Sequence, residues 1–584
     1  MTDERKLAIP APEGDIQVNF CKNPKCNNFG IAPEGPDGNR RYRYLQKTPL
    51  THALFCKACD RISILKANTS INSELQRFQF PVDSQPPLVC PEKSCENHAR
   101  VVHQHQGSYR KFGKTASGSP RYQCKSCGKI FSQKKQTRRH RRPELNERIF
   151  MSLVNRIPFN RICEIENVQP KTIYDKLTYI YNHCRRFSAK HELKLARQPK
   201  KDFFLATDTR NLHLNWQHAS SRKNTCIQTV TTVDTDSGYV LACHDNINME
   251  YSLEAIEQQL NDYPGSQPLA FRPHAHFLVR SDYRATDVKS PAIQSNNLLE
   301  DIEQKYREMS IRQDFAVAGV LNNNTSPPSE GVQVRFDYTL YGHFARLKQL
   351  LPDAGKHIFY LAYDSGLREA CISLYADRIR SGQAEAFYIR IGNELSIASK
   401  RQKIREANNH FRAVQECHPH LDKRAIEQLI ILERMKEMPV IGHWGDSWLF
   451  HPSPHMGEPD KAVCHITHQS QLPEKELANY YLHASLFGAS QFYERLKNRI
   501  SMVPIQNNAE PPGMWKLYGA YKPSVVIKLI EILRTYHNFV LTDKYGETPA
   551  KRLGISQQGY SISEILNCQP GKTMTSGLKE TIVA

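Results

Sequence analysis

The sequence predicts a multidomain protein. Two small cysteine-rich units and a unit of three helices precede an α/β domain that contains a helical insertion. Eight of the 16 cysteines lie before residue 130, arranged as two copies of one pattern. A stretch with helical periodicity follows, and beyond residue 200 short apolar strands alternate with helices. The 584 residues are enough for three or four domains of ~150 residues each.

The composition favours an anionic partner. Lys and Arg total 79 against 59 Asp and Glu, which gives a net charge of +20 and a pI of about 9.2. Such an excess is typical of proteins that bind nucleic acid. The chain opens with charged residues and carries no uncharged apolar run approaching ~18 residues, so we expect neither a signal peptide nor a membrane-spanning segment. We therefore expect a cytoplasmic protein with no membrane partner, whose cysteines act as metal ligands or buried thiols.

The cysteine pattern occurs twice at a nearly constant offset, and each copy consists of a Cys-x4-Cys pair followed by a Cys-x2-Cys pair. Four thiolates complete a tetrahedral Zn²⁺ shell and leave no open position for catalysis. We therefore predict two structural Zn²⁺ sites, in zinc ribbons over residues 15–70 and 85–135. The predicted ligands are Cys21, Cys26, Cys56 and Cys59 in the first ribbon and Cys90, Cys95, Cys124 and Cys127 in the second.

A basic segment joins the second ribbon to the predicted helices. From Arg100 to Arg142 there are 13 Lys or Arg residues and no Asp or Glu. A block of like charge is often a solvated linker, but its position here favours contacts with DNA phosphates, which position a protein without reading sequence. The residues predicted to make these contacts are Lys134, Lys135, Arg138, Arg139, Arg141 and Arg142.

Residues 143–190 are predicted to form a helix-turn-helix unit. Pro143 and Glu144 mark a helix start, a short helix follows over 159–165, and a longer one runs from about 169 to 186. Apolar side chains at spacings of three and four give the longer helix one buried face. Lys171 and Lys176 are predicted to face outward and to contact DNA. The alternative is a three-helix packing unit with no ligand.

Two acids close apolar strands in the region after residue 200. A first strand over 203–208 ends in Asp208, and a later strand from 357 ends in Asp364. Counted from the first of these strands, the predicted elements follow the order β-β-β-α-β-α-β, which is that of the ribonuclease-H-like fold. There, carboxylates from the first and fourth strands meet and hold two divalent ions for phosphoryl transfer. The alternative is that each acid is an ordinary turn residue. We predict this domain over residues 200–395 and 470–560, interrupted by a helical insertion over 396–470.

The C-terminal part carries a further pattern, an aromatic-Asn-Phe segment over 536–540 followed by a Thr-Pro-Ala element over 547–555. With it, the chain resembles bacterial insertion-sequence transposases of the acidic-triad (DDE) class, which combine a zinc ribbon, a helix-turn-helix and a ribonuclease-H-like domain in this order. The resemblance implies a DNA transposase that cuts element ends and joins 3′-hydroxyls to target DNA. It also implies catalytic Mg²⁺ or Mn²⁺ held by Asp208 and Asp364, double-stranded DNA as partner, and a homo-oligomer.

The third acid of this resemblance is open. The predicted helix over 475–502 contains a Leu-Lys-Asn-Arg stretch, and aligning it places Ser490 where the family usually has Glu. Glu494 lies one turn further along the same helix face, and Glu458 is another candidate for the catalytic site. If Ser490 is the true equivalent, the chain is instead a domesticated, catalytically inactive, sequence-specific DNA-binding protein.

Overall fold

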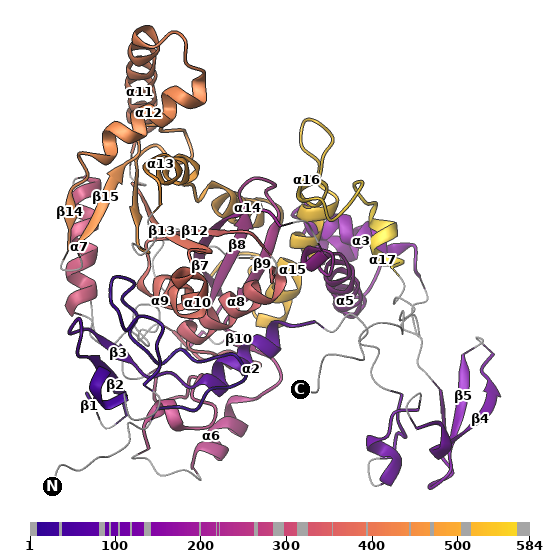
Figure 1. The fold of residues 1–584 in the computed structure, drawn as a ribbon. Helices are drawn as coiled ribbons and strands as arrows, with labels where there is room; N and C mark the ends of the chain where they lie inside the picture. Colours follow the sequence, from indigo (N-terminus) through magenta and orange to yellow (C-terminus); the bar gives the residue numbers. More distant parts are fainter. Residues whose placement is uncertain are drawn as a thin grey trace, which may run out of the picture.

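The structure is a computed structural model in which residues 9–568 are described, apart from internal gaps (Figure 1). The gaps are residues 34–37, 49, 81–87, 93–94, 103–104, 117–118, 133–141, 198–199, 218, 221, 262–266, 284–296, 312–324, 353, 393–394, 443–444, 468–471 and 504–514.

The first cysteine-rich unit is a three-stranded antiparallel sheet followed by a helix. Its strands pair in the order β1–β2–β3, and helix α2 (Asn68–Phe78) packs against α8 (Phe336–Leu350) of the α/β domain. The two helices approach closely, because a Cβ added to Gly342 would lie 2.7 Å from the Cβ of Glu74. The unit is therefore built into the larger domain. The bounds are α1 Gly38–Arg41, β1 Tyr42–Gln46, β2 His52–Cys56 and β3 Ile62–Ile64.

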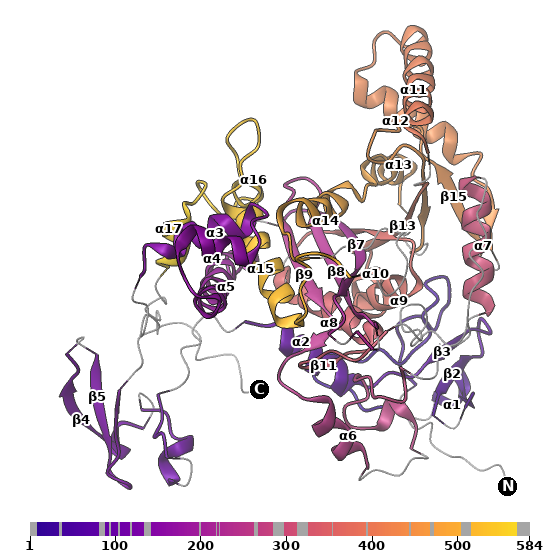
Figure 2. The ribbon, with the colours of Figure 1, turned by 180° about the vertical axis from the view of Figure 1, so that it is seen from behind.

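The second cysteine-rich unit repeats this sheet with a core of its own. Strands β4 (Tyr109–Lys114), β5 (Pro120–Cys124) and β6 (Ile130–Ser132) form an antiparallel sheet in the order β4–β5–β6. Its buried side chains, among them Val102 and Tyr109, form a separate cluster. Figure 2 shows this unit apart from the rest of the described chain.

Three helices follow in the predicted order: α3 (Leu145–Val154), α4 (Phe159–Glu166) and α5 (Pro170–Glu192). Pro at the first position of α5 costs no hydrogen bond and presets the helical φ. The C-terminal helix α15 (Pro523–Phe539) packs along α5, and α17 (Ile562–Leu566) packs on α3 and α5. This helical group therefore combines residues 145–192 with C-terminal helices that lie more than 300 residues further along the sequence.

The α/β domain is built on one mixed sheet of eight strands. Its order is β14–β15–β16–β13–β12–β7–β8–β9; β7, β12 and β13 are parallel neighbours, and the other pairs are antiparallel. Nearly every side chain of β12 is buried, as expected for a central parallel strand covered on both faces. The bounds are β7 Phe203–Leu214, β8 Thr225–Asp234, β9 Val240–Asp245, β12 His357–Ala362, β13 Ala384–Ile391, β14 Val440–Ile441, β15 Asp446–Phe450 and β16 Lys461–His465.

Helices cover both faces of this sheet. On one face lies α8, whose His343 Nε2 is 2.7 Å from Thr232 Oγ1 of β8, and the Thr232 hydroxyl in turn bonds Thr207 of β7. Helices α9 (Ser365–Leu374) and α10 (Ala376–Arg380) follow β12 and pack on β12 and β13. On the other face, α14 (Phe487–Arg499) packs on β7 and β8.

Two predictions about residues after 395 need correction. The stretch 396–470 is helical only in its first half, where α11 (Ile397–Cys417) and α12 (Lys423–Met435) form the projecting hairpin of Figure 1, whereas β14, β15 and β16 extend the main sheet. Their apolar runs are too short to distinguish from helical segments by periodicity. The predicted helix over 475–502 is two helices, because the backbone leaves helical geometry between α13 (Glu474–His483) and α14.

The described parts of residues 247–335 lie beside the first cysteine-rich unit and the sheet. They contain α6 (Leu253–Asn261), α7 (Leu298–Ile311) and a small antiparallel pair, β10 (Ile247–Asn248) with β11 (Val332–Gln333). Ala270 and Phe271, in a 3₁₀ turn of this segment, pack into the core of the first cysteine-rich unit. The unit is thus held from two sides.

Candidate functional site

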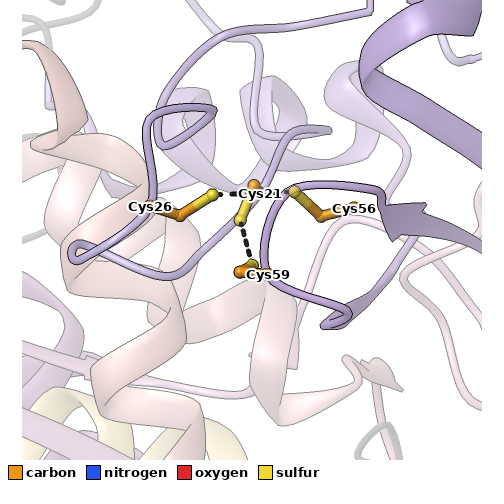
Figure 3. A group of neighbouring side chains, drawn as sticks. All are labelled: Cys21, Cys26, Cys56 and Cys59. Carbon is orange, nitrogen blue, oxygen red and sulfur yellow. Dashed lines mark hydrogen bonds between the residues drawn. The ribbon is translucent and has the colours of Figure 1, made fainter.

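The first four-cysteine group is fully assembled. Cys21 and Cys26 come from the loop that precedes β1, Cys56 ends β2, and Cys59 lies in the turn that follows (Figure 3). Sγ atoms are 3.5 Å apart for Cys21 and Cys59 and 3.7 Å apart for Cys26 and Cys56. All four sulfur atoms lie within 4.8 Å of one another.

The second group has the same geometry. Sγ atoms are 3.3 Å apart for Cys90 and Cys127 and 3.7 Å apart for Cys95 and Cys124, and all four again lie within 4.8 Å. A Zn²⁺ ion holding four thiolates at ~2.3 Å sets the sulfur atoms ~3.8 Å apart. Both groups therefore fit structural zinc sites.

Outer residues of the two groups also correspond. Asn28 donates its Nδ2 hydrogen to Cys56 Sγ, and Asn97 donates to Cys124 Sγ, each over 3.3 Å. Tyr42 and Tyr109 accept a hydrogen bond from the backbone N–H of the first cysteine of their unit. Such partners orient metal ligands. Neither the two asparagines nor the two tyrosines were predicted from the sequence, although a Cys-x-Asn motif occurs at the same place in both copies.

The hydrogen bonds around Cys124 favour its thiolate. Burial alone would raise the pKa of Cys124, but the bonds from Asn97 and from the backbone N–H groups of Ser126 and Cys127 outweigh burial and lower the pKa to about 6. The same balance lowers the pKa of Cys56. A thiolate is the form that binds zinc, so one sulfur atom of each group is favoured as a thiolate, whereas burial raises the pKa of Cys21 and Cys90.

Asp208 lies in the middle of β7 rather than at its end, which corrects the sequence prediction. Strand β7 continues to Leu214 because it pairs with β8 over ten residues. The Asp208 carboxylate is buried on the face covered by α14, where Arg210 Nη1 lies 2.8 Å from Oδ2 and Ser490 Oγ lies 3.4 Å from the same oxygen. Burial raises the pKa of Asp208, and the Arg210 guanidinium opposes that rise.

Asp364 follows the neighbouring strand, β12, and caps α9 by accepting a hydrogen bond from the Leu367 N–H at 3.0 Å. Thr207 pairs with Leu361 in the parallel register, so Asp208 is level with Ala362. Side chains two residues apart on a strand share a face, and Asp364 is still extended (φ −142°). With ~4.8 Å between strands and ~3.3 Å per residue, the Cα atoms of the two acids lie about 8 Å apart on one face.

The third predicted acid does not form a cluster with this pair. Ser490, on α14, is the side chain that contacts Asp208, and Glu494 is exposed one turn further along the helix. Among the described residues, the two four-cysteine groups are the only places where three or more Cys, His, Asp or Glu side chains lie close enough to hold a metal ion.

Glu458 is part of a different, buried network. Its carboxylate accepts hydrogen bonds from Lys461 Nζ at 3.0 Å and from the Leu486 N–H at 2.6 Å, and His455 Nε2 is 3.1 Å away. Burial would raise the pKa of Glu458, but the His455 hydrogen bond and the Lys461 charge lower it to about 2. These contacts connect the β15–β16 loop to the start of α14, a structural role.

We expect Glu458→Gln to lower the free energy of unfolding by about 3 kcal/mol at pH 7, because it leaves the Lys461 ammonium buried without its counter-charge. A lowered carboxyl pKa stabilises the fold above the unfolded value of about 4.5 and loses that effect as the pH falls toward 2. Denaturant unfolding from pH 7 to pH 2 should therefore show the two proteins converging in acid. Equal stability at pH 7 would contradict this assignment.

The predicted DNA contacts are only partly within the described residues. Lys134, Lys135, Arg138, Arg139 and Arg141 lie outside them. Arg142 is exposed beside Glu144, and Lys171 is exposed at the start of α5.

Lys176 is a correction, because it is buried instead of facing outward. Its Nζ donates to the Arg142 carbonyl at 2.8 Å and to Asn146 Oδ1 at 2.6 Å, and burial lowers its pKa. Helical spacing explains the error, since Lys176 follows Ile173 by three positions and precedes Ile180 by four, on the apolar face.

The chain matches no protein-family model and no curated protein. Among the described residues, the helices all fall short of the length or the apolar character that crossing a bilayer requires.

Proposed function

We propose that the chain is a DNA transposase of the DDE class that cuts element ends and joins 3′-hydroxyls to target DNA. The observation that carries the proposal is the pair Asp208, in β7 beside α14, and Asp364, which follows the adjacent parallel strand β12. The strand order of β9, β8, β7, β12 and β13, with the first three antiparallel and the last three parallel, supports a ribonuclease-H-like core.

The donor set suits a hard divalent cation. Carboxylate oxygens are the ligands that Mg²⁺ and Mn²⁺ prefer. Asp208 and Asp364 would hold these ions, with Glu494, which lies outside this pair in the structure, as the proposed third ligand. When bound, the ions activate the attacking oxygen and stabilise the leaving oxygen of a phosphodiester. Arg210, whose side chain is 40 % exposed beside Asp208, would contribute positive charge toward a DNA phosphate.

Duplex DNA is the proposed partner, because the net charge of +20 favours a polyanion. The helices α3, α4 and α5 would act as the helix-turn-helix, with the exposed Lys171 at the groove. A homo-oligomer that holds two DNA ends follows from the same proposal.

A strand-transfer assay tests the function. The full chain is incubated with Mg²⁺ or Mn²⁺ and DNA that carries the repeats flanking its gene. We expect cleaved and joined products, and Glu494→Gln should reduce their rate roughly 100-fold or more because it removes a charged ligand. Asn498→Ala, an exposed change one turn further along α14, is the matched control. Full activity of Glu494→Gln would exclude Glu494 as the third acid.

One observation favours a second candidate, a catalytically inactive, sequence-specific DNA-binding protein. Ser490, not a carboxylate, contacts Asp208. In this case the wild-type chain binds the repeats without cutting them, and Ser490→Glu should create metal-dependent nicking. Nicking by the unaltered chain would reject the second candidate.

A further inference from the structure

The two cysteine-rich units have the same sheet but different surroundings. In the first, Tyr42 pairs with Cys56 and Arg43 with Phe55; in the second, Tyr109 pairs with Cys124 and Arg110 with Gln123. The third strands also correspond, since Ile62 pairs with Phe55 as Ile130 pairs with Gln123. The residues on either side of the cysteine that ends the second strand therefore have counterparts in the other sheet, up to the bulge between Lys111 and Lys114 of β4.

Buried charges fasten the first unit to the α/β domain. Lys22 Nζ donates to Tyr341 Oη at 2.7 Å and forms an ion pair with Glu369, at side-chain exposures of 9 % and 23 %. Lys66, 4 % exposed, pairs with Asp337. Both pairs cross from this unit to the α/β domain, so they form only when the unit is docked there, beside the contact of α2 with α8. Its geometry is that of a fixed support.

The second unit presents the same sheet to solvent. Strand alternation and the register place Arg110, Arg121 and Gln123 on the face opposite Cys124. Phe112 is 41 % exposed, and the Arg121 guanidinium lies 5.4 Å from its ring centre. Ile130 is 40 % exposed on the same face. We call this set, Arg110, Phe112, Arg121, Gln123 and Ile130, the outer face.

The corresponding face of the first unit is different. Ala53, the counterpart of Arg121, is completely buried. Phe55 stands where the second unit has Gln123, and Arg43 is the cation that remains, 4.9 Å above the Phe55 ring. Ile62, the counterpart of Ile130, is 43 % exposed. The first copy has therefore replaced one of two arginines by a buried alanine, while the second keeps both arginines on this face.

We propose that the duplicated units have divided their roles: the second binds duplex DNA through its outer face, and the first serves only to support the α/β domain. The identity of the ligand rests on the proposed function. A small β-sheet edge or ribbon fits the major groove of B-DNA, and two arginines on such a face contact phosphates or the acceptors of guanine. Lys114, Lys125 and Lys129, all exposed in the same unit, extend the positive surface along the DNA backbone.

The test compares matched charge reversals in the full chain. Arg110→Glu/Arg121→Glu alters the outer face, and Arg43→Glu/Lys57→Glu alters exposed cations of the first unit. Binding is measured by fluorescence anisotropy of a labelled duplex that carries the flanking repeats, at several salt concentrations. We expect the first variant to lose at least about tenfold in affinity and to show a salt slope shallower by roughly two. The second variant should stay within about twofold of wild type.

Two further measurements guard against misreading. Zinc content must remain unchanged in both variants, which shows that the units are folded, and Arg110→Lys/Arg121→Lys should recover most of the affinity because it restores the charge. Equal losses in the two charge-reversal variants, or a larger loss from the first unit, would overturn the inference.

If the chain cuts no DNA but the predicted ranking holds, the proposed function fails and the division of roles stands. If the chain cuts and joins DNA while the variants bind alike, only the division of roles fails.

Discussion

Asp208→Asn and Asp364→Asn are each expected to reduce DNA cleavage and joining roughly 1000-fold or more while leaving DNA affinity within about twofold. Both substitutions keep the size of the side chain and remove the charge that would hold a divalent ion. Asp208 lies in β7 and Asp364 just after β12, whereas Lys171 and the outer face, which are proposed to bind DNA, belong to other units. The measurement is the strand-transfer assay combined with anisotropy binding on the same DNA.

The matched control is Asp236→Asn, an exposed acid in the β8–β9 hairpin, which should keep full activity. Stability provides a second check. Because burial raises the pKa of Asp208 in the folded chain, its charged form reduces stability at neutral pH, and Asn should not lower the melting temperature. If either Asn variant still cuts DNA, the catalytic role of that residue is rejected. The same holds if the variant loses DNA affinity together with cutting.

Cys56→Ser and Cys124→Ser are expected to have very different effects on stability, although each should cost one zinc ion. Cys56 belongs to the unit held by the Lys22–Glu369 and Lys66–Asp337 pairs, so its loss should destabilise the α/β domain as well. Cys124 belongs to a unit with its own core, so Cys124→Ser should unfold that unit alone. Calorimetry and metal analysis measure both results.

When a chelator is added to the wild-type chain, the second unit, which is more exposed, should release its zinc before the first unit does. Cys127 is exposed, whereas the first group has three buried cysteines and one half-buried. If Cys56→Ser and Cys124→Ser lower the temperature of the main unfolding transition equally, the first unit is no more tightly integrated into the α/β domain than the second. Unchanged zinc content in Cys124→Ser would contradict its role as a ligand.

The sequence predicted best those features whose signals are local. Cysteine spacing alone identified both four-cysteine groups, because metal ligation demands particular residues at particular positions. Helical periodicity located α4 and the start of α5 to within about one residue, although α5 continues to Glu192, beyond the predicted end at about 186.

What the sequence did not predict depends on contacts between distant segments. Nothing local to Lys22 indicates that it will meet Glu369, 347 residues away. The sheet strands β14, β15 and β16 are short and were assigned to a helical insertion. Asp208 was placed at a strand end because the apolar run stops there, yet β7 continues through Thr209 and Arg210 since its partner β8 does.

The support role of the first unit also has a consequence during synthesis. The last of its zinc ligands to be made is Cys59, but the partner of Lys22 is Glu369. A ribosome adding about 5–20 residues per second needs on the order of 15–60 s to make the residues between Cys59 and Glu369. Until then Lys22 and Lys66 must remain hydrated, and the surface of α2 that later packs on α8 stays uncovered. The second unit, whose four ligands all lie between Cys90 and Cys127, can finish folding long before the N-terminal one has found its place.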